Sequence, residues 1–193
     1  MGLKEAKRYI NQLHRLQADP LSWPDYLTGL PGRKASLQML RETLPKLGAW
    51  AVAYVRVANI YPYLFKYGPE RHVELIEWAA AILKTEAQRY RGSFVGTMGT
   101  HDFLLLAKSR HIGQLLSSAA ELFGRRTKSF YSPQDRRAGV LLSFQYQGAP
   151  MRVGLMQLIW ALRAERTGLN EVELLEQLRS SLAATERSLF VLK

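Results

Sequence analysis

The residues with the clearest chemical potential are His101 and Asp102, which lie in the stretch "GTHDF" (residues 99–103). A glycine-led turn that carries an imidazole and a carboxylate, followed by an apolar run, has the form of a hairpin tip at an active site. With His111 nearby in sequence, these side chains suggest a metal site or an acid/base pair. Adjacent residues of a strand point to opposite faces, so we expect His101 and Asp102 to diverge and predict no metal site.

Other catalytic patterns are absent from the sequence. The chain contains no cysteine, which excludes disulfides and thiolate metal sites. It has neither a G-x-S-x-G nucleophile motif nor a Walker A loop, so a serine hydrolase and an ATPase are not indicated. Trp50, Trp78 and Trp160 fall on or beside predicted core elements, and we expect them to pack rather than to stack on a ligand.

The charge balance favours contact with anions without identifying them. The chain carries 27 Lys and Arg against 16 Asp and Glu, a net charge of +11. The densest basic stretch is "GRRTKSFYSPQDRR" (residues 124–137), which we interpret as a solvated loop, with a polyanion contact as the alternative. The N-terminus lacks the apolar core of a signal peptide, and no apolar stretch approaches the roughly 20 residues that span a bilayer. We therefore expect no membrane span and a cytoplasmic location.

The elements that must position these residues follow from periodicity. Residues 49–57 predict a central strand, and residues 93–97 and 102–107 predict a hairpin around the "GTHDF" turn. Helices are predicted at 33–46, 72–90, 110–123 and 150–166, and a further strand at 138–146. Helix 72–90 has an apolar stripe, formed by Val73, Ile76, Ala80, Leu83 and Ala87. Helices interleaved with strands of one sheet favour an α/β (α+β) fold of ferredoxin-like type, with a mostly antiparallel central sheet.

Two further amphipathic helices are predicted outside this unit. Residues 3–17 carry a stripe of Leu3, Ala6, Ile10 and Leu13, and residues 171–188 carry one of Val172, Leu175, Leu178 and Leu182. We therefore divide the chain into an N-terminal helix and linker (1–21), a central domain (22–170) and a C-terminal amphipathic helix (171–193). Either helix could present its apolar face to a partner.

The central domain resembles the GGDEF domains of diguanylate cyclases. "DYLTGLPGR" (residues 25–33) resembles their D-x-L-T-G-L-x-N-R turn, with Gly32 in place of the asparagine. The matching residues of this turn are Asp25, Leu27, Thr28, Gly29, Leu30 and Arg33. The residues that occupy the five signature positions are Gly99, Thr100, His101, Asp102 and Phe103. "YLFKYG" (63–68) falls at the family's N-D-x-x-G-H region, and "AERTGLN" (164–170) resembles its closing A-K-x-x-G-R-N. The resemblance implies a GGDEF palm fold.

In this family two subunits each present a GTP, and carboxylates hold the Mg²⁺ that supports phosphoryl transfer. The resemblance places Arg56 and Ala58 at the two metal-binding aspartates, and Leu64 and Phe65 at the residues that read guanine. It also places Tyr61 and Glu165 at two lysine positions, Pro69 at a histidine position, and Tyr90–Ser93 at the R-x-x-D product-inhibition motif. Only Asp102 retains a carboxylate at a metal position. No acidic residue lies anywhere from 49 to 69, so cyclase activity is expected to be lost.

The sequence therefore favours a catalytically inactive GGDEF-like domain that serves as a signalling or regulatory interaction module. It implies no metal or cofactor, and its partner would be another protein or a second copy of itself. An alternative is a magnesium-independent sensor of a nucleotide or other phosphorylated ligand, with Arg56 as the phosphate contact. A third interpretation is polyanion binding through residues 124–137, although nucleic acid is not expected as a partner.

Overall fold

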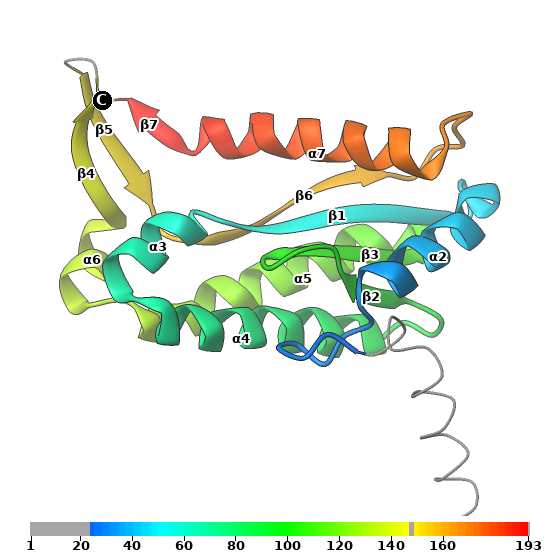
Figure 1. The fold of residues 1–193 in the computed structure, drawn as a ribbon, viewed down its shortest axis with the longest axis horizontal. Coiled ribbons are helices and arrows are strands. Elements are labelled where there is room, and N and C mark those ends of the chain that lie inside the picture. The colour runs from blue at the N-terminus through cyan, green and yellow to red at the C-terminus, as the bar shows by residue number, and fades with distance from the viewer. Residues whose placement is uncertain (1–23, 147–148, 193) are drawn as a thin grey trace, which may run out of the picture.

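The computed structural model describes residues 24–146 and 149–192, and a four-stranded antiparallel sheet lies at its centre (Figure 1). The strand order is β2-β3-β1-β6, and every neighbouring pair runs antiparallel. The strands are β1 (Trp50–Ala58), β2 (Phe94–Thr97), β3 (Asp102–Lys108) and β6 (Gln157–Arg163). The predicted central strand and the hairpin around the "GTHDF" turn are confirmed. The fold class, an α/β arrangement with an antiparallel sheet flanked by helices, is confirmed as well.

Helices cover both faces of this sheet. In Figure 1, α4 (Pro69–Gln88) and α5 (Ser109–Arg126) lie below it, and α7 (Glu171–Ser188) lies above it. Helix α2 (Arg33–Thr43), followed by the short η2 (Leu44–Lys46), packs on the same face as α7. Residues of β1 alternate between the two layers, since Ala53 and Val55 pack toward α4 and α5 while Val52 and Tyr54 pack toward α7. All four are fully buried.

The predicted helix at 72–90 is confirmed as α4, which begins at Pro69. Proline is tolerated there because the backbone N–H groups of a first turn have no hydrogen-bond partner within the helix. Its stripe of Ile76, Ala80, Leu83 and Ala87 is buried as expected, but Val73 is 40% exposed. The predicted helices at 33–46 and 110–123 are confirmed as α2 and α5.

The prediction of a helix at 150–166 is wrong. That segment forms β5 (Ala149–Gly154) and the central strand β6. Strand β4 (Val140–Tyr146) is found where a strand was predicted, but it belongs to a separate three-stranded sheet. There β5 is the middle strand, between β4 and β7 (Phe190–Leu192). Three short helices were not predicted: α3 (Ile60–Tyr67), η3 (Thr127–Phe130) and α6 (Pro133–Ala138).

The two outer helices have different outcomes. The predicted helix 3–17, with its stripe of Leu3, Ala6, Ile10 and Leu13, lies outside the described residues. The apolar face of α7 is buried against the sheet through Leu175, Leu178 and Leu182, so it is not free for a partner, whereas Val172 is 66% exposed. No helix in the described ranges is long and apolar enough to cross a membrane.

Candidate functional site

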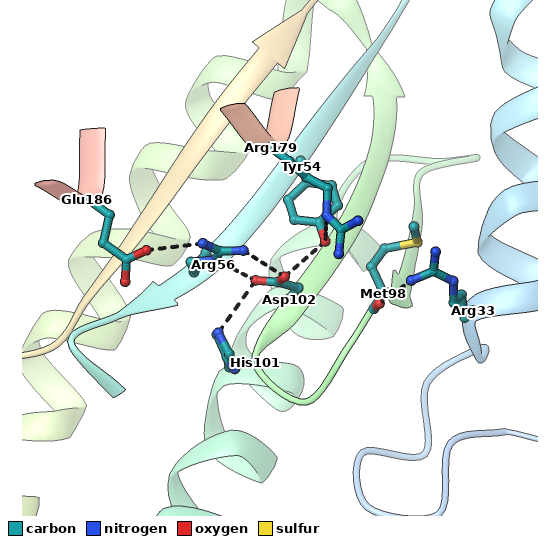
Figure 2. A network of polar contacts seen from close by, with 8 residues as sticks. All are labelled: Arg33, Tyr54, Arg56, Met98, His101, Asp102, Arg179 and Glu186. Carbon is teal, nitrogen blue, oxygen red and sulfur yellow. Dashed lines mark hydrogen bonds and ion pairs between the residues drawn. The ribbon is translucent and has the colours of Figure 1, made fainter. Parts of the chain in front are cut away.

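An ion pair joins the ends of β1 and β3 under α7. The register of the two strands places Arg56 directly opposite Asp102. The Arg56 guanidinium donates from Nε to Asp102 Oδ1 at 2.7 Å and from Nη2 to Oδ2 at 2.9 Å, a bidentate pair (Figure 2). Asp102 is buried, and the Arg56 side chain is 18% exposed. The carboxylate that could have served a metal is therefore bound by a guanidinium.

Two further elements complete this network. Tyr54, two residues before Arg56 on β1 and on the same face, donates its hydroxyl proton to Asp102 Oδ2 at 2.9 Å. From α7, Arg179 Nε donates to the Tyr54 hydroxyl at 3.1 Å, and its guanidinium carbon lies 5.6 Å from the centre of the Tyr54 ring. Also from α7, Glu186 accepts a hydrogen bond from Arg56 Nη1 at 3.1 Å. Helix α7 thus closes the network from above.

The contacts within this network shift the pKa values of Asp102, Arg56 and Tyr54. Burial alone would raise the pKa of Asp102, but the hydrogen bonds and positive charge of Arg56 outweigh it and hold that pKa below its ordinary value. The hydrogen bonds to Asp102 raise the pKa of Arg56 above its ordinary value, which is already high. Burial, together with the nearby Asp102 carboxylate, raises the pKa of Tyr54 to about 12. At neutral pH the site therefore contains a fixed ion pair and a neutral phenol.

His101 lies beside this pair, and the expectation that it would diverge from Asp102 is wrong. His101 belongs to the turn before β3, not to the strand, and its Nε2 lies 4.0 Å from Asp102 Oδ1. Its ring meets Tyr61 of α3 edge-on at 5.2 Å between centroids. Burial lowers the pKa of His101, although the Asp102 carboxylate opposes this. His111 lies beyond the other end of β3, in α5, where it stacks on Tyr90.

The turn at residues 25–33 packs against the same hairpin. Asp25 Oδ1 accepts from the backbone nitrogen and the hydroxyl of Thr28, and Gly29 adopts a positive φ of 63° that favours glycine. Arg33 follows the turn and donates to the backbone oxygen of Met98 at 3.1 Å (Figure 2). A hollow of about 320 Å³ lies between this turn and the exposed residues Gly99 and Thr100.

A groove of about 620 Å³ opens next to the ion pair, between α2 and α7. Three arginines line it, Arg33, Arg56 and Arg179, together with one carboxylate, Glu176. Its apolar wall includes Leu37 and Val172. An excess of guanidinium groups favours an anion in this groove.

The other positions predicted from sequence lie around or away from this network. Ala58 is buried at the end of β1, Leu64 is half-buried, and Phe65 is 85% exposed on α3. Glu165 is exposed in the connection between β6 and α7, which a bond from Gly48 N to Ala164 O ties to the start of β1. Because Arg56 lies near the opposite end of β1, Glu165 belongs to no common site with it.

Sequence reasoning did not identify Tyr54, Arg179 or Glu186 as site residues. Tyr54 looked like one more core residue of an apolar strand, and the other two are single charges on an amphipathic helix. The one available signal was that α7 places an arginine and a glutamate seven residues apart, which puts them on the same helix face.

Comparison with solved structures places this architecture among known folds. The diguanylate cyclase SiaD of Pseudomonas aeruginosa, solved with its activator SiaC, matches with a TM-score of 0.63 at 17% identity, over 97% of this chain and 67% of that one. The coiled coil and GGDEF domain of DgcB from Caulobacter crescentus, bound to c-di-GMP, matches with a TM-score of 0.64 at 15% identity, over 96% of this chain and 90% of that one. The S helix-GGDEF-EAL unit of Vibrio cholerae LapD, also bound to c-di-GMP, matches with a TM-score of 0.64 at 14% identity, over 95% of this chain and 38% of that one.

The sequence matches no family model and no curated protein. At these low identities the structural likeness concerns the fold, and it agrees with the strand order and helix layers described above. The chain therefore has the fold of GGDEF diguanylate cyclase domains.

Proposed function

We propose that this chain is a GGDEF-like module that does not synthesise cyclic di-GMP and that acts by binding another protein or a second copy of itself. The observation that supports this most is the bidentate pair between Arg56 and Asp102. It lies at positions where the resemblance to the cyclases implies metal-binding carboxylates.

The chemistry of the donor set supports the loss of metal-dependent transfer. Both oxygens of Asp102 accept hydrogen bonds, from Arg56 and from Tyr54. A divalent cation there would have to displace a guanidinium and would be repelled by it. Across residues 24–146 and 149–192, no group of three or more His, Asp or Glu side chains could hold a metal ion.

A docking role is supported by the aromatic face of α3. Tyr61 is 64% exposed and Phe65 is 85% exposed. They are four residues apart and therefore lie on the same side of the helix. Exposed aromatic pairs of this kind are enriched in protein interfaces. The surface lies directly beside the ion-pair network, because Tyr61 contacts His101.

The first test is an assay of the protein with GTP and either Mg²⁺ or Mn²⁺, with a functional diguanylate cyclase as the positive control. We expect no cyclic di-GMP above the no-enzyme background, and product formation would overturn the proposal. The docking role is tested by chemical cross-linking and sedimentation of the wild-type protein beside Tyr61→Ser/Phe65→Ser. Loss of a dimer or of a defined partner complex in this variant is the expected result, and its retention would reject this surface.

The groove between α2 and α7 favours a second candidate, magnesium-independent binding of a phosphorylated ligand. Each of the three nitrogens of Arg56 already donates to a carboxylate, so Arg33 and Arg179 are the better candidates for phosphate contacts. Titration calorimetry with GTP and with cyclic di-GMP, with and without Mg²⁺, would test this. Binding that survives EDTA and disappears in Arg179→Ala is expected, and the absence of saturable binding would reject it.

A further inference from the structure

A second groove, of about 450 Å³, lies on the opposite side of the sheet from the ion-pair network. Helix α4 forms one wall, and the end of α5, η3 and α6 form the other. The residues that line it are Glu74, Trp78, Arg125, Arg126, Lys128, Ser129, Phe130 and Arg136. It thus combines one indole, one carboxylate and four cationic side chains.

The indole of Trp78 is accessible within this groove. The residue is 41% exposed, so Trp78 is less completely packed than the sequence led us to expect. The core side of α4 at this level is occupied by Ile76, Ala79 and Ala80, which leaves Trp78 at the edge of the helix.

The aromatic residues of the basic segment 124–137, unlike Trp78, offer little exposed ring surface to a ligand. Phe130 and Tyr131 are both buried, at 7% and 6% exposure. The hydroxyl of Tyr131 accepts a hydrogen bond from the backbone nitrogen of Met156, which fixes it in the core. Across the groove from this segment, the Trp78 indole is therefore the aromatic side chain with exposed surface for stacking.

The positive charges of this groove are largely uncompensated. Among the described residues, Arg126, Lys128 and Arg136 form no ion pair, and Arg125 has only a 3.8 Å contact with Glu121. The nearest acid of the segment, Asp135, is buried and bound by Lys66 and Tyr67. The excess of cations in the groove is accordingly available to an anionic ligand.

From this juxtaposition we infer, contrary to the expectation from the sequence, that the groove binds single-stranded nucleic acid. A base stacks on the Trp78 indole, and the adjoining phosphates lie against Arg126, Lys128 and Arg136. Glu74 repels phosphate, so it orients the strand with its base toward α4 and its backbone toward η3 and α6. Stacking on Trp78 requires an unpaired base, which selects a single strand over a duplex. The net charge of +11 adds a general attraction for the polyanion.

The test is fluorescence anisotropy with a labelled 12-nucleotide single strand of mixed sequence and its duplex, together with quenching of tryptophan emission. We expect the single strand to bind more tightly than the duplex, and the logarithm of the affinity to fall with the logarithm of salt concentration with a slope of about −2 to −3, for three or four phosphates. Trp78→Ala should weaken binding about tenfold, while Trp78→Tyr should retain most of it.

A matched pair of charge reversals separates this groove from general electrostatic attraction. Arg126→Glu/Lys128→Glu and Lys46→Glu/Arg187→Glu change the net charge by the same amount, but the second pair lies in η2 and α7, away from the groove. We expect the first pair of changes to weaken the affinity for the single strand at least tenfold, and the second pair to weaken it much less. Circular dichroism would check that each variant is folded.

Equal losses in the two pairs, unchanged binding in Trp78→Ala, or equal affinity for the duplex would each overturn the inference. Binding of mononucleotides without binding of the oligonucleotide would overturn it as well. These results are independent of the cyclase assay and of Arg179→Ala, which probe the opposite face of the sheet.

Discussion

Arg56 and Asp102 face each other across neighbouring antiparallel strands and form a bidentate ion pair (Figure 2). Asp102 also accepts from Tyr54, and Arg56 also donates to Glu186. The pair is thus held by three elements, β1, β3 and α7. A buried ion pair of this kind contributes most clearly when one partner is removed, because the other is left without compensation.

Asp102→Asn is expected to destabilise the protein by about 2 to 4 kcal/mol, because it leaves the Arg56 guanidinium without its bidentate partner in a largely buried position. Urea denaturation followed by circular dichroism would measure this. Glu165→Gln is the matched control, since Glu165 is exposed in a connection, and its effect should stay within about 0.5 kcal/mol. Equal effects of the two changes would show that the pair has no special role.

The contribution of Asp102 should depend on pH with a defined sign. Its folded pKa lies below the ordinary value of about 3.9, so its stabilising effect is fully present above that value and is lost as the pH falls through the folded pKa. The difference in unfolding free energy between the wild-type protein and Asp102→Asn should stay constant from about pH 7 to 8, where His101 is neutral in both proteins, and shrink below about pH 4. A difference that persists unchanged at pH 3 would contradict this.

His101 should act over a higher pH range. Burial lowers its folded pKa below the ordinary value of about 6.5, so below that pH the unfolded chain takes up the proton first. Stability is then lost as the pH falls from about 6.5 through the folded pKa. His72 has a pKa lowered by burial too, so His101→Gln and His72→Gln should each reduce the slope of stability between pH 5 and 7. An unchanged slope in His101→Gln would contradict the assignment.

Two glycines should respond to alanine with opposite signs. A Cβ on Gly96 would lie 2.1 Å from Ser36 Oγ and 2.9 Å from the Phe94 ring, and Ser36 is fixed by its bond to the Thr97 carbonyl. Gly96→Ala should therefore destabilise by about 1 to 3 kcal/mol. Gly113 lies in α5 with open space around it, so Gly113→Ala should stabilise by about 0.5 to 1 kcal/mol. Thermal denaturation of both variants would reveal whether the signs differ.

The parts of the fold that follow local rules could be predicted from the sequence. The turn at 25–33 encodes its own geometry, because Asp25 accepts from Thr28 and Gly29 supplies the positive φ. Helix α4 likewise has a clear stripe. Strand β6 was misread because both of its faces are buried: Leu158 packs in one core and Ile159 in the other, so the apolar run lacks the alternation of a strand.

Other features depend on contacts that no local pattern encodes. Helix α3 contains Pro62, which disfavours a helix in most positions but is tolerated here because it falls in the first turn. The ion-pair network unites β1 with two residues of α7, Arg179 and Glu186, that lie 125 and 130 positions away from their partners. Only the packing of α7 on the sheet brings them together.

That separation along the chain affects how the protein is made. While a nascent chain leaves the ribosome, β1 and β3 are complete long before Leu178 and Leu182 are available to cover them. Until then, the part of this sheet face that α7 covers in the folded protein is exposed to water, and an exposed apolar surface of this kind is prone to association with other partly folded chains. The core on this face of the sheet is therefore completed only after the last turns of α7 have been synthesised.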